Sequence, residues 1–232
     1  MLHLSNDAIH LVCDPSGYDL ALIDRRRGTR WALDERTLVY SAGSDPVERA
    51  PLVPVGALKT NNDTLTVTYD AGGAEVRMVY TLRDDHVEVV LPVPDAAAVR
   101  AVALPGSFAP VGERLRLLLP IMQGMLWDGR GEAFEHVRAE GSHLGFSMAF
   151  VGYLGDTGGL PLTTETSDDQ RWWFGKRADG RFWATDLQIA SLGALAYSRS
   201  VRLYPNAGDI VAVAKRYRRR VQDRGRFITW DE

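Results

Sequence analysis

The 232-residue sequence contains a single cysteine, Cys13. One thiol forms no disulfide within the chain and is too few for a cysteine-based zinc site, so a disulfide-stapled secreted scaffold is excluded. A basic excess is also lacking, because 27 Lys and Arg residues face 30 Asp and Glu residues, for a net charge of −3. Binders of nucleic acid or acidic membranes normally carry a clear positive excess. We therefore expect neither nucleic acid nor a membrane as a partner.

Long hydrophobic runs and targeting signals are missing as well. The most apolar stretch, residues 117–122, is far shorter than the roughly 20 residues that span a bilayer. Residues 1–7 show no basic segment followed by an apolar run, which a secretory signal requires. These absences predict a cytoplasmic location.

Motifs for metals, phosphates and nucleophiles are also lacking. The histidines show no His-x-x-x-His spacing, and the glycine-rich segment 152–159 lacks the Lys-Ser/Thr pair of a phosphate-binding loop. No G-x-S-x-G sequence occurs, and Cys13 has no cationic neighbour that would activate it. We expect no bound metal and no cofactor.

What the sequence does contain is alternation of apolar and polar residues with a period of two. The clearest stretch is 64–91, where Leu65, Val67 and Tyr69 alternate with threonines and two further alternating runs follow. Turn residues at 70–73 and 83–85 separate the three runs. Alternation places one set of side chains on a buried face, so the stretch predicts three antiparallel strands in a meander.

Similar short runs recur along most of the chain. They lie at residues 8–14, 18–24, 37–42, 98–104, 114–119, 145–154, 159–165, 171–174, 181–187 and 196–203. Roughly a dozen short strands with turn residues every ~8–12 positions predict an all-β sandwich or barrel, and no helical period interrupts them to form βαβ units. The proline-containing stretch 45–54 predicts a loop or a broken edge strand, because proline removes a hydrogen-bond donor.

The pattern changes near the C-terminus, where the apolar residues are spaced as one face of an α-helix. They are Ile210, Val213, Ala214, Tyr217 and Val221. Asp209 is placed to cap the start of this helix and Gly225 to end it. Arginines fill the other faces, where they favour the negative end of the helix dipole. The sequence therefore predicts one terminal helix that packs its apolar stripe on the sandwich.

One segment concentrates carboxylates and tryptophans, namely 163–174, which reads T-T-E-T-S-D-D-Q-R-W-W-F. Sugar chemistry uses paired carboxylates, and aromatic rings stack on pyranose faces. Adjacent Trp172 and Trp173 must point to opposite faces of a strand, so one belongs in the core and the other covers a ligand, a neighbouring domain or the same chain. The side chains that we expect to contact a sugar are Trp127, Trp172, Trp173, Asp168 and Arg171.

A catalytic pair within the chain is a second hypothesis for these residues. His143 and Glu165 are the candidates for acid and base, and the hypothesis predicts that they lie within ~6 Å of each other in a solvent-filled cleft. The alternative for Glu165 is the end of a strand beside an acidic turn, and the alternative for His143 is an exposed loop residue.

The order of segments resembles a known family. The resemblance rests on residues 4–33, V-Y-T-L-R-D-D-H-V-E-V at 79–89, A-L-P-G-S-F at 103–108, L-L-L-P-I-M-Q-G-M-L-W at 117–127 and T-E-T-S-D-D at 164–169. The chain is similar to the N-terminal galactose-mutarotase-like β-supersandwich that precedes the barrel in bacterial glycoside hydrolases related to the endo-α-N-acetylgalactosaminidase group. In that family the nucleophile and the acid/base lie on the barrel, so the resemblance assigns no catalytic residue here.

The resemblance implies a fold, a domain division and a function. The fold is an antiparallel β-supersandwich with one C-terminal helix, divided into a sandwich at 1–205 and a helix with linker at 206–232. Because Phe227, Ile228 and Trp230 restart a strand-like pattern at the end of the chain, we expect another domain to follow. The expected function is a non-catalytic domain of a glycoside hydrolase that buttresses a (β/α)₈ barrel and contributes to sugar binding.

Two alternatives stay open. One is a stand-alone sugar epimerase or lyase on the same fold, which would use His143 and Glu165. The other is an interaction module that forms a homo-oligomer with its tryptophans buried in a two-fold interface.

Overall fold

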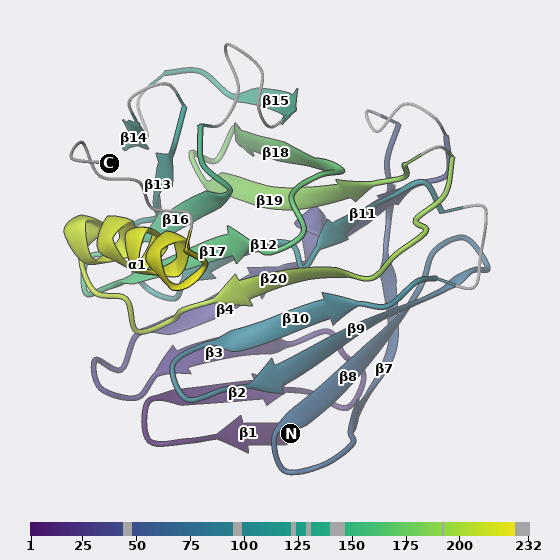
Figure 1. The fold of residues 1–232 in the computed structure, drawn as a ribbon, viewed down its shortest axis with the longest axis horizontal. Coiled ribbons are helices and arrows are strands. Elements are labelled where there is room, and N and C mark those ends of the chain that lie inside the picture. Colours follow the sequence, from purple (N-terminus) through teal and green to yellow (C-terminus); the bar gives the residue numbers. More distant parts are fainter. Residues whose placement is uncertain are drawn as a thin grey trace.

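A computed structural model describes residues 1–43, 48–94, 99–121, 124–128, 131–139, 147–191 and 193–225, with the backbone alone described for 136–139. Within these ranges the strands form three antiparallel sheets and are followed by one α-helix, α1 (Ile210–Asp223) (Figure 1). A short 3₁₀ helix, η1 (Glu35–Thr37), follows the fourth strand. The prediction of an all-β antiparallel sandwich with a C-terminal helix is confirmed.

Neighbouring strands within each sheet are hydrogen-bonded to one another in the following spatial order. The five-stranded sheet consists of β1 (Leu2–Ser5), β2 (Ile9–Cys13), β3 (Leu20–Asp24), β4 (Arg30–Asp34) and β12 (Ser107–Pro110). The nine-stranded sheet consists of β14 (Met125–Trp127), β13 (Arg116–Leu119), β16 (Phe150–Leu154), β17 (Gly159–Thr164), β20 (Arg199–Leu203), β10 (Val87–Leu91), β9 (Glu75–Leu82), β8 (Thr64–Asp70) and β7 (Val53–Lys59). The six-stranded sheet consists of β15 (Phe134–Ala139), β18 (Gln170–Lys176), β19 (Phe182–Ile189), β11 (Ala101–Leu104), β5 (Val39–Ser41) and β6 (Ala50–Pro51).

The predicted meander over 64–91 is present as β8, β9 and β10. Leu65 pairs with Tyr80 and Val67 with Met78, and Tyr80 pairs with Val89 on the other side. All five of these side chains are buried. The alternation in the sequence therefore predicted both the strands and the face that they bury.

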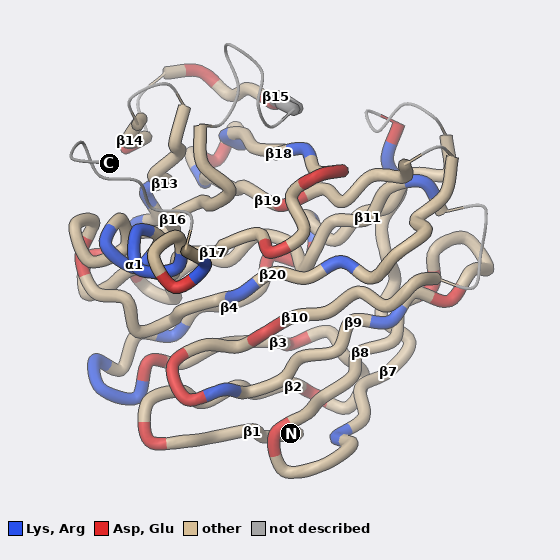
Figure 2. The backbone as a smooth tube through the Cα atoms, in the orientation of Figure 1, with Lys and Arg blue, Asp and Glu red and all other residues tan. Residues whose placement is uncertain are grey.

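The main core lies between the nine-stranded sheet and the other two sheets. It contains Leu11 and Trp31 from the five-stranded sheet, Val67 and Tyr80 from the nine-stranded sheet, and Trp172 from the six-stranded sheet. Figure 2 shows long stretches of the central strands without charged residues, whereas Lys and Arg gather on α1 and in several loops. The layers thus hold together by apolar burial, and the charged groups occupy their periphery.

Helix α1 begins and ends where the sequence predicted. The Asp209 carboxylate accepts a hydrogen bond from the Ala212 N–H at 2.8 Å, and Gly225 follows the helix with a φ of 65° that favours glycine. Residue Val213 packs against Phe150 and Leu154 of β16. The helix is therefore attached to the outer side of the nine-stranded sheet, across β16 and β17 (Figure 1).

The face that α1 buries differs from the predicted apolar stripe. Ile210 and Ala214 are exposed, whereas Arg220 is buried with Val213. Tyr217 stacks on Phe150 with ring centres 4.8 Å apart. The prediction was wrong for Ile210 and Ala214, because the buried face also includes Arg220, which binds the carboxylate of Glu165 on the sandwich.

The nine-stranded sheet ends at β7, which begins with Val53 and Pro54, the last two residues of the stretch 45–54 predicted as a loop or a broken edge strand; Ala50–Pro51 of that stretch form β6, and 45–47 lie outside the described residues. Its pairing with β8 is interrupted by a β-bulge between Pro54 and Gly56. Val55 and Leu58 of this strand are 66% and 69% exposed. On the edge side, the Lys59 ammonium donates a hydrogen bond to the His3 carbonyl of β1 at 3.1 Å.

Among the described residues, no helix has both the length and the apolar character needed to cross a membrane.

Candidate functional site

Glu165, one of the two predicted catalytic residues, lies directly after β17 and binds arginines of α1. Its carboxylate accepts a hydrogen bond from Arg220 Nε at 2.6 Å and forms an ion pair with Arg224. A third guanidinium, that of Arg202 on β20, lies 3.8 Å from the carboxylate. The Glu165 side chain is 6% exposed and that of Arg220 is 7% exposed. Glu165 therefore sits in an ion-pair cluster at the junction of helix and sandwich.

This environment defines what Glu165 can do. Both of its oxygens face guanidinium groups, and Arg220 also donates to the Thr164 carbonyl. A carboxylate bound in this way anchors the helix and presents no free oxygen to a substrate. His143, the predicted partner of Glu165, lies outside the described residues.

A buried polar network continues from the junction into the sandwich. Asp186 accepts hydrogen bonds from Thr164 Oγ1 and, at 2.6 Å, from Gln188 Nε2, and Gln170 Nε2 donates to Thr164 Oγ1 at 2.8 Å. These residues belong to β17, β18 and β19, in two different sheets. The network thus connects the six-stranded sheet to the nine-stranded sheet at Thr164, the residue whose carbonyl binds Arg220 of α1.

Trp172 and Trp173 point to opposite faces of β18, as the strand geometry predicted. Trp172 is fully buried in the main core. Its ring offers no face to a ligand, so the expectation that it stacks on a sugar is corrected. Trp173 packs against Trp183 with ring centres 4.2 Å apart, and the Arg49 guanidinium lies 4.1 Å from the Trp173 ring. We predicted that this tryptophan covers a ligand, a neighbouring domain or part of the same chain; Trp173 packs against its own chain.

Trp127 is half-buried and belongs to a group of aromatic rings. Its ring centre lies 4.7 Å from that of Phe134, 5.1 Å from Phe174 and 6.0 Å from Phe182. The neighbouring side chains of Met125 and Phe134 are partly exposed. Trp127 thus joins β14 to β15, β18 and β19 and keeps part of its surface at the solvent.

Asp168 and Arg171 lie apart from these rings. Asp168 is exposed in the turn before β18. The adjacent Asp169 accepts a hydrogen bond from Tyr197 Oη at 2.8 Å and pairs with the buried Arg199 at 3.3 Å, and burial lowers the pKa of Arg199. Arg171 lines a separate small pocket of about 200 Å³. Among the described residues, the predicted site residues therefore do not converge on one cavity.

Burial also decides the chemistry of Cys13. Its thiol is inside the core, and burial raises its pKa to about 12. A thiol in this environment stays protonated at neutral pH and is a poor nucleophile.

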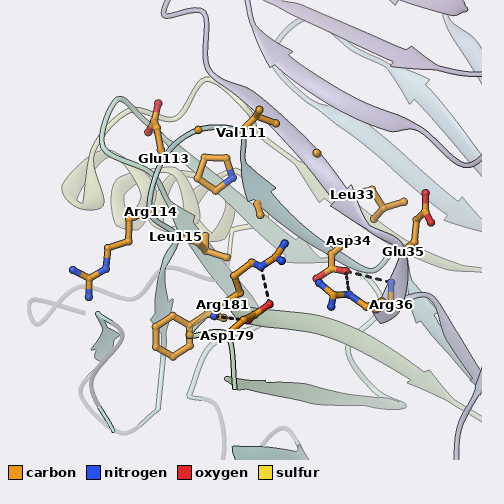
Figure 3. Close-up of a pocket in the computed structure, with 16 residues that line it drawn as sticks. Leu33, Asp34, Glu35, Arg36, Val111, Glu113, Arg114, Leu115, Asp179 and Arg181 are labelled. Atoms are coloured by element: carbon orange, nitrogen blue, oxygen red, sulfur yellow. Dashed lines mark hydrogen bonds and ion pairs between the residues drawn. The ribbon is translucent and has the colours of Figure 1, made fainter. Parts of the chain in front are cut away.

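A groove of about 820 Å³ lies at one end of the sandwich, where three loops meet (Figure 3). Its walls are the end of β4 with η1, the loop between β12 and β13, and the turn between β18 and β19. These segments are far apart in the sequence, so no local motif marks the groove. Its residues include Leu33, Asp34, Glu35, Arg36, Val111, Glu113, Arg114, Leu115, Asp179 and Arg181.

The charged groups of the groove are held in different ways. Asp34 pairs with Arg177 and Arg36, and Asp179 accepts a hydrogen bond from the Arg181 backbone N–H, which lowers its pKa. Figure 3 shows Glu35 and Glu113 on opposite sides of the groove.

The two glutamates have opposite electrostatic environments. Hydrogen bonds from Thr157 outweigh the effect of burial and lower the pKa of Glu113. Burial and the carboxylates of Asp19, Asp14 and Asp34 raise the pKa of Glu35. The groove is thus lined by carboxylate acceptors, guanidinium donors and the apolar side chain of Leu115. This combination suits a polar ligand with hydroxyl groups.

The junction residue that sequence reasoning missed is Arg220. Its place in a run of arginines favours one of the other faces of the helix, away from the apolar stripe. However, Val213, Tyr217, Arg220 and Arg224 are spaced by four, three and four residues, so they share one face of a helix. This spacing was the signal that the arginines continue the buried stripe.

Comparisons with known proteins find likeness in structure only. No model of a known protein family matches the sequence, and no curated protein sequence matches it. Among solved structures, the chain is similar to the α-N-acetylgalactosaminidase NagBb from Bifidobacterium bifidum. Its complex with Gal-NHAc-DNJ matches with a TM-score of 0.76 and 18% identity, and its ligand-free form with 0.75 and 17%. At this identity the likeness shows a shared fold.

The extent of the match is unequal in the two proteins. It covers 97–100% of this chain but 39–40% of the NagBb chains. This chain thus corresponds to less than half of the enzyme that it resembles in structure.

Proposed function

We propose that this chain is the β-sandwich domain of a glycoside hydrolase whose catalytic residues lie outside residues 1–232. The observation that carries the proposal is the whole-length match to 39–40% of an α-N-acetylgalactosaminidase. The remaining part of such an enzyme would supply the catalytic domain, as the sequence resemblance to N-terminal galactose-mutarotase-like domains implies. The activity expected for the complete protein is cleavage of a glycosidic bond.

The proposed role of the domain is mechanical. Residues 1–205 form the sandwich, and residues 206–232 form the helix and the linker toward a (β/α)₈ barrel. The ion pairs of Glu165 with Arg220 and Arg224 hold α1 on β17. A helix fixed at several points leaves the sandwich at a defined angle and would set the position of the domain that follows.

A contribution to sugar binding is the second part of the proposal. The groove of Figure 3 has the volume and the mixture of donors and acceptors that a sugar requires. Of the residues predicted to contact sugar, Trp127, Asp168 and Arg171 retain exposed atoms, so they remain proposed contacts. The dimerising module is less favoured, because Trp172 and Trp173 are buried in their own chain.

The test of the catalytic assignment uses the uninterrupted reading frame that encodes this chain. The complete polypeptide and residues 1–232 alone are each assayed with aryl α-N-acetylgalactosaminide and other aryl glycosides. We expect hydrolysis by a longer polypeptide and none by residues 1–232. A reading frame that closes after Glu232, together with sugar turnover by this chain alone, would overturn the proposal in favour of an epimerase or lyase.

The sugar contact is tested separately by thermal unfolding of residues 1–232 with monosaccharides and short glycans. A ligand at 100 times its dissociation constant stabilises the folded state by about 2.7 kcal/mol, which shifts the midpoint by several degrees. A shift that is lost in Asp34→Asn supports a sugar site in the groove. If no sugar raises the unfolding midpoint, the sugar-binding part of the proposal is wrong and only the mechanical role stands.

A further inference from the structure

A second pocket, of about 350 Å³, lies against the C-terminal half of α1. Three separate segments line it: the turn between β9 and β10, strand β20, and α1. Its residues are Asp85, His86, Arg202, Tyr204, Arg216, Arg219, Arg220, Asp223 and Arg224. Figure 2 shows that Lys and Arg residues recur along α1, the helix that supplies most of these arginines.

The pocket concentrates positive charge on a chain that is negative overall. Five guanidinium groups line it together with two aspartates, and two further carboxylates lie close to it: Glu165, which pairs with Arg202, Arg220 and Arg224, and Glu88, which lies opposite Arg202 on β10. With four carboxylates set against five guanidinium groups, one positive charge remains in excess, against a net charge of −3 for the whole sequence. Such a local excess attracts anions even when the protein as a whole repels them.

Two of these arginines retain donors for a ligand. Among the described residues, Arg219 has no ion-pair partner and its side chain is exposed. The Nε–H of Arg202 is buried without a hydrogen-bond acceptor in the described part of the chain. Glu165 and Tyr204 raise the pKa of Arg202 although its burial alone would lower it, so this guanidinium stays charged. A buried donor without an acceptor is unfavourable until an acceptor binds.

The carboxylate on the opposite wall does not repel an anion strongly. Asp85 pairs with Arg216 and accepts a hydrogen bond from His86 Nδ1 at 2.7 Å. The Arg216 guanidinium also lies 4.9 Å from the centre of the Tyr204 ring, and both side chains line the pocket. Asp85 therefore orients a donor and is neutralised by it.

Stabilisation of the helix dipole does not account for the whole cluster. It favours arginines at the C-terminal end of α1, such as Arg220 in the last turn and Arg224 at the C-cap. It gives no reason for Arg202, which comes from β20, to lie beside them with a buried donor. The Glu165 carboxylate accounts for the position of the Arg202 guanidinium, but the buried Nε–H of Arg202 keeps no acceptor, and this donor indicates a site for a ligand.

We propose that this pocket binds an oxyanion, held by Arg202 and Arg219 and flanked by Arg216. The chemistry fits a phosphate, a sulfate or a carboxylate, either as a free ion or as the acidic group of a sugar, because guanidinium groups recognise such oxygens in pairs. The inference goes beyond the proposed function and does not depend on it, since it rests on side chains of the described residues alone.

The test is calorimetric titration of residues 1–232 with inorganic phosphate, inorganic sulfate, glucuronate, galactose 6-sulfate and neutral galactose. We expect binding of the anions and none of galactose. Similar affinity for phosphate and galactose 6-sulfate indicates a site for the free ion, whereas tighter binding of galactose 6-sulfate or glucuronate indicates an acidic sugar. Absence of binding by all four anions overturns the inference.

Single-residue variants test whether the anions bind in this pocket. Arg219→Gln removes a side chain without a described partner, so its fold should be intact, and we expect about tenfold weaker anion binding. Arg202→Gln should have a similar effect. The control is Lys215→Gln, which removes one positive charge from the same helix outside the pocket lining and should change affinity less than about twofold. Equal losses in the variants and the control would show that the charge of the helix, and not the pocket, attracts the anion.

Discussion

At the scale of single residues, Glu165 shows where prediction from the sequence reaches its limit. Its neighbourhood of carboxylates and tryptophans suggested acid–base chemistry. Its actual environment depends on Arg220 and Arg224, which lie 55 and 59 positions further along the chain. Local composition contains no information about such a partner, because only the fold brings the two segments together.

Replacement of this carboxylate tests its anchoring role. Glu165→Gln leaves the buried guanidinium of Arg220 without a counter-charge. Removing one partner of a buried ion pair costs about 3–5 kcal/mol, so we expect a loss of that order in the free energy of unfolding. Urea denaturation followed by circular dichroism measures it.

The matched control for this change is Glu88→Gln. Glu88 pairs with Arg83 at 3.2 Å on a more exposed surface, so its replacement should cost less than about 1 kcal/mol. If Glu165→Gln instead made the protein more stable, the residue would behave like a strained catalytic group, and the anchoring role would be wrong.

At the scale of elements, the sequence predicted what depends on local periodicity. The meander β8–β10 and the limits of α1 follow from alternation, turn residues and caps. The groove could not be predicted in this way, because Asp34, Glu113 and Asp179 come from three segments that are far apart in the sequence. Trp172 and Trp173 illustrate both kinds of feature. Their opposite directions could be predicted from strand geometry, whereas the contacts of Trp173 with Arg49 and Trp183 depend on how distant segments fold together.

The close contact of α1 with β17 gives a prediction at this scale. A Cβ at Gly159 would lie 2.6 Å from Val213 Cγ2 and 2.8 Å from the Gly208 carbonyl oxygen. Gly159→Ala should therefore displace α1 and destabilise the fold by about 1–3 kcal/mol. Hydrogen exchange should show faster exchange of the α1 amides.

Gly158→Ala is the control at the adjacent position. Its Cβ would meet only Thr29 Oγ1 at 3.5 Å and Arg27 Cδ at 3.7 Å, which are ordinary contacts. We expect a change within about 0.5 kcal/mol and normal protection of α1. Equal effects of the two alanines would contradict the close packing of α1 at Gly159.

At the scale of the whole molecule, the sandwich and α1 share one packing interface. Phe150 and Leu154 of the sheet are buried against Val213 of the helix, and Ala149 donates its backbone N–H to Tyr217 Oη at 3.2 Å. The division at residue 205 therefore separates residues that contact each other. Contacts with α1 therefore contribute to the stability of the sandwich, whether or not the helix also leads to another domain.

Truncation tests this conclusion. A chain that ends at Pro205 loses α1, exposes Phe150 and Leu154, and leaves Glu165 without Arg220 and Arg224. We expect a lower unfolding midpoint and association through the uncovered apolar patch, which denaturation and size-exclusion chromatography would detect. A chain that ends at Gly225 keeps every described contact of α1 and should match residues 1–232. Equal stability of the two truncated chains would mean that α1 contributes nothing to the sandwich.

The bulge in β7 has a consequence for how the protein behaves at high concentration. Exposed valine and leucine side chains on an edge strand favour pairing with a strand of another copy of the protein, and repeated pairing in register produces fibres. Pro54 has no N–H to offer an incoming strand, and the offset at Gly56 breaks the repeat that such growth needs. The irregularity at Pro54–Gly56 therefore acts as a built-in stop to polymerisation at the edge of the largest sheet.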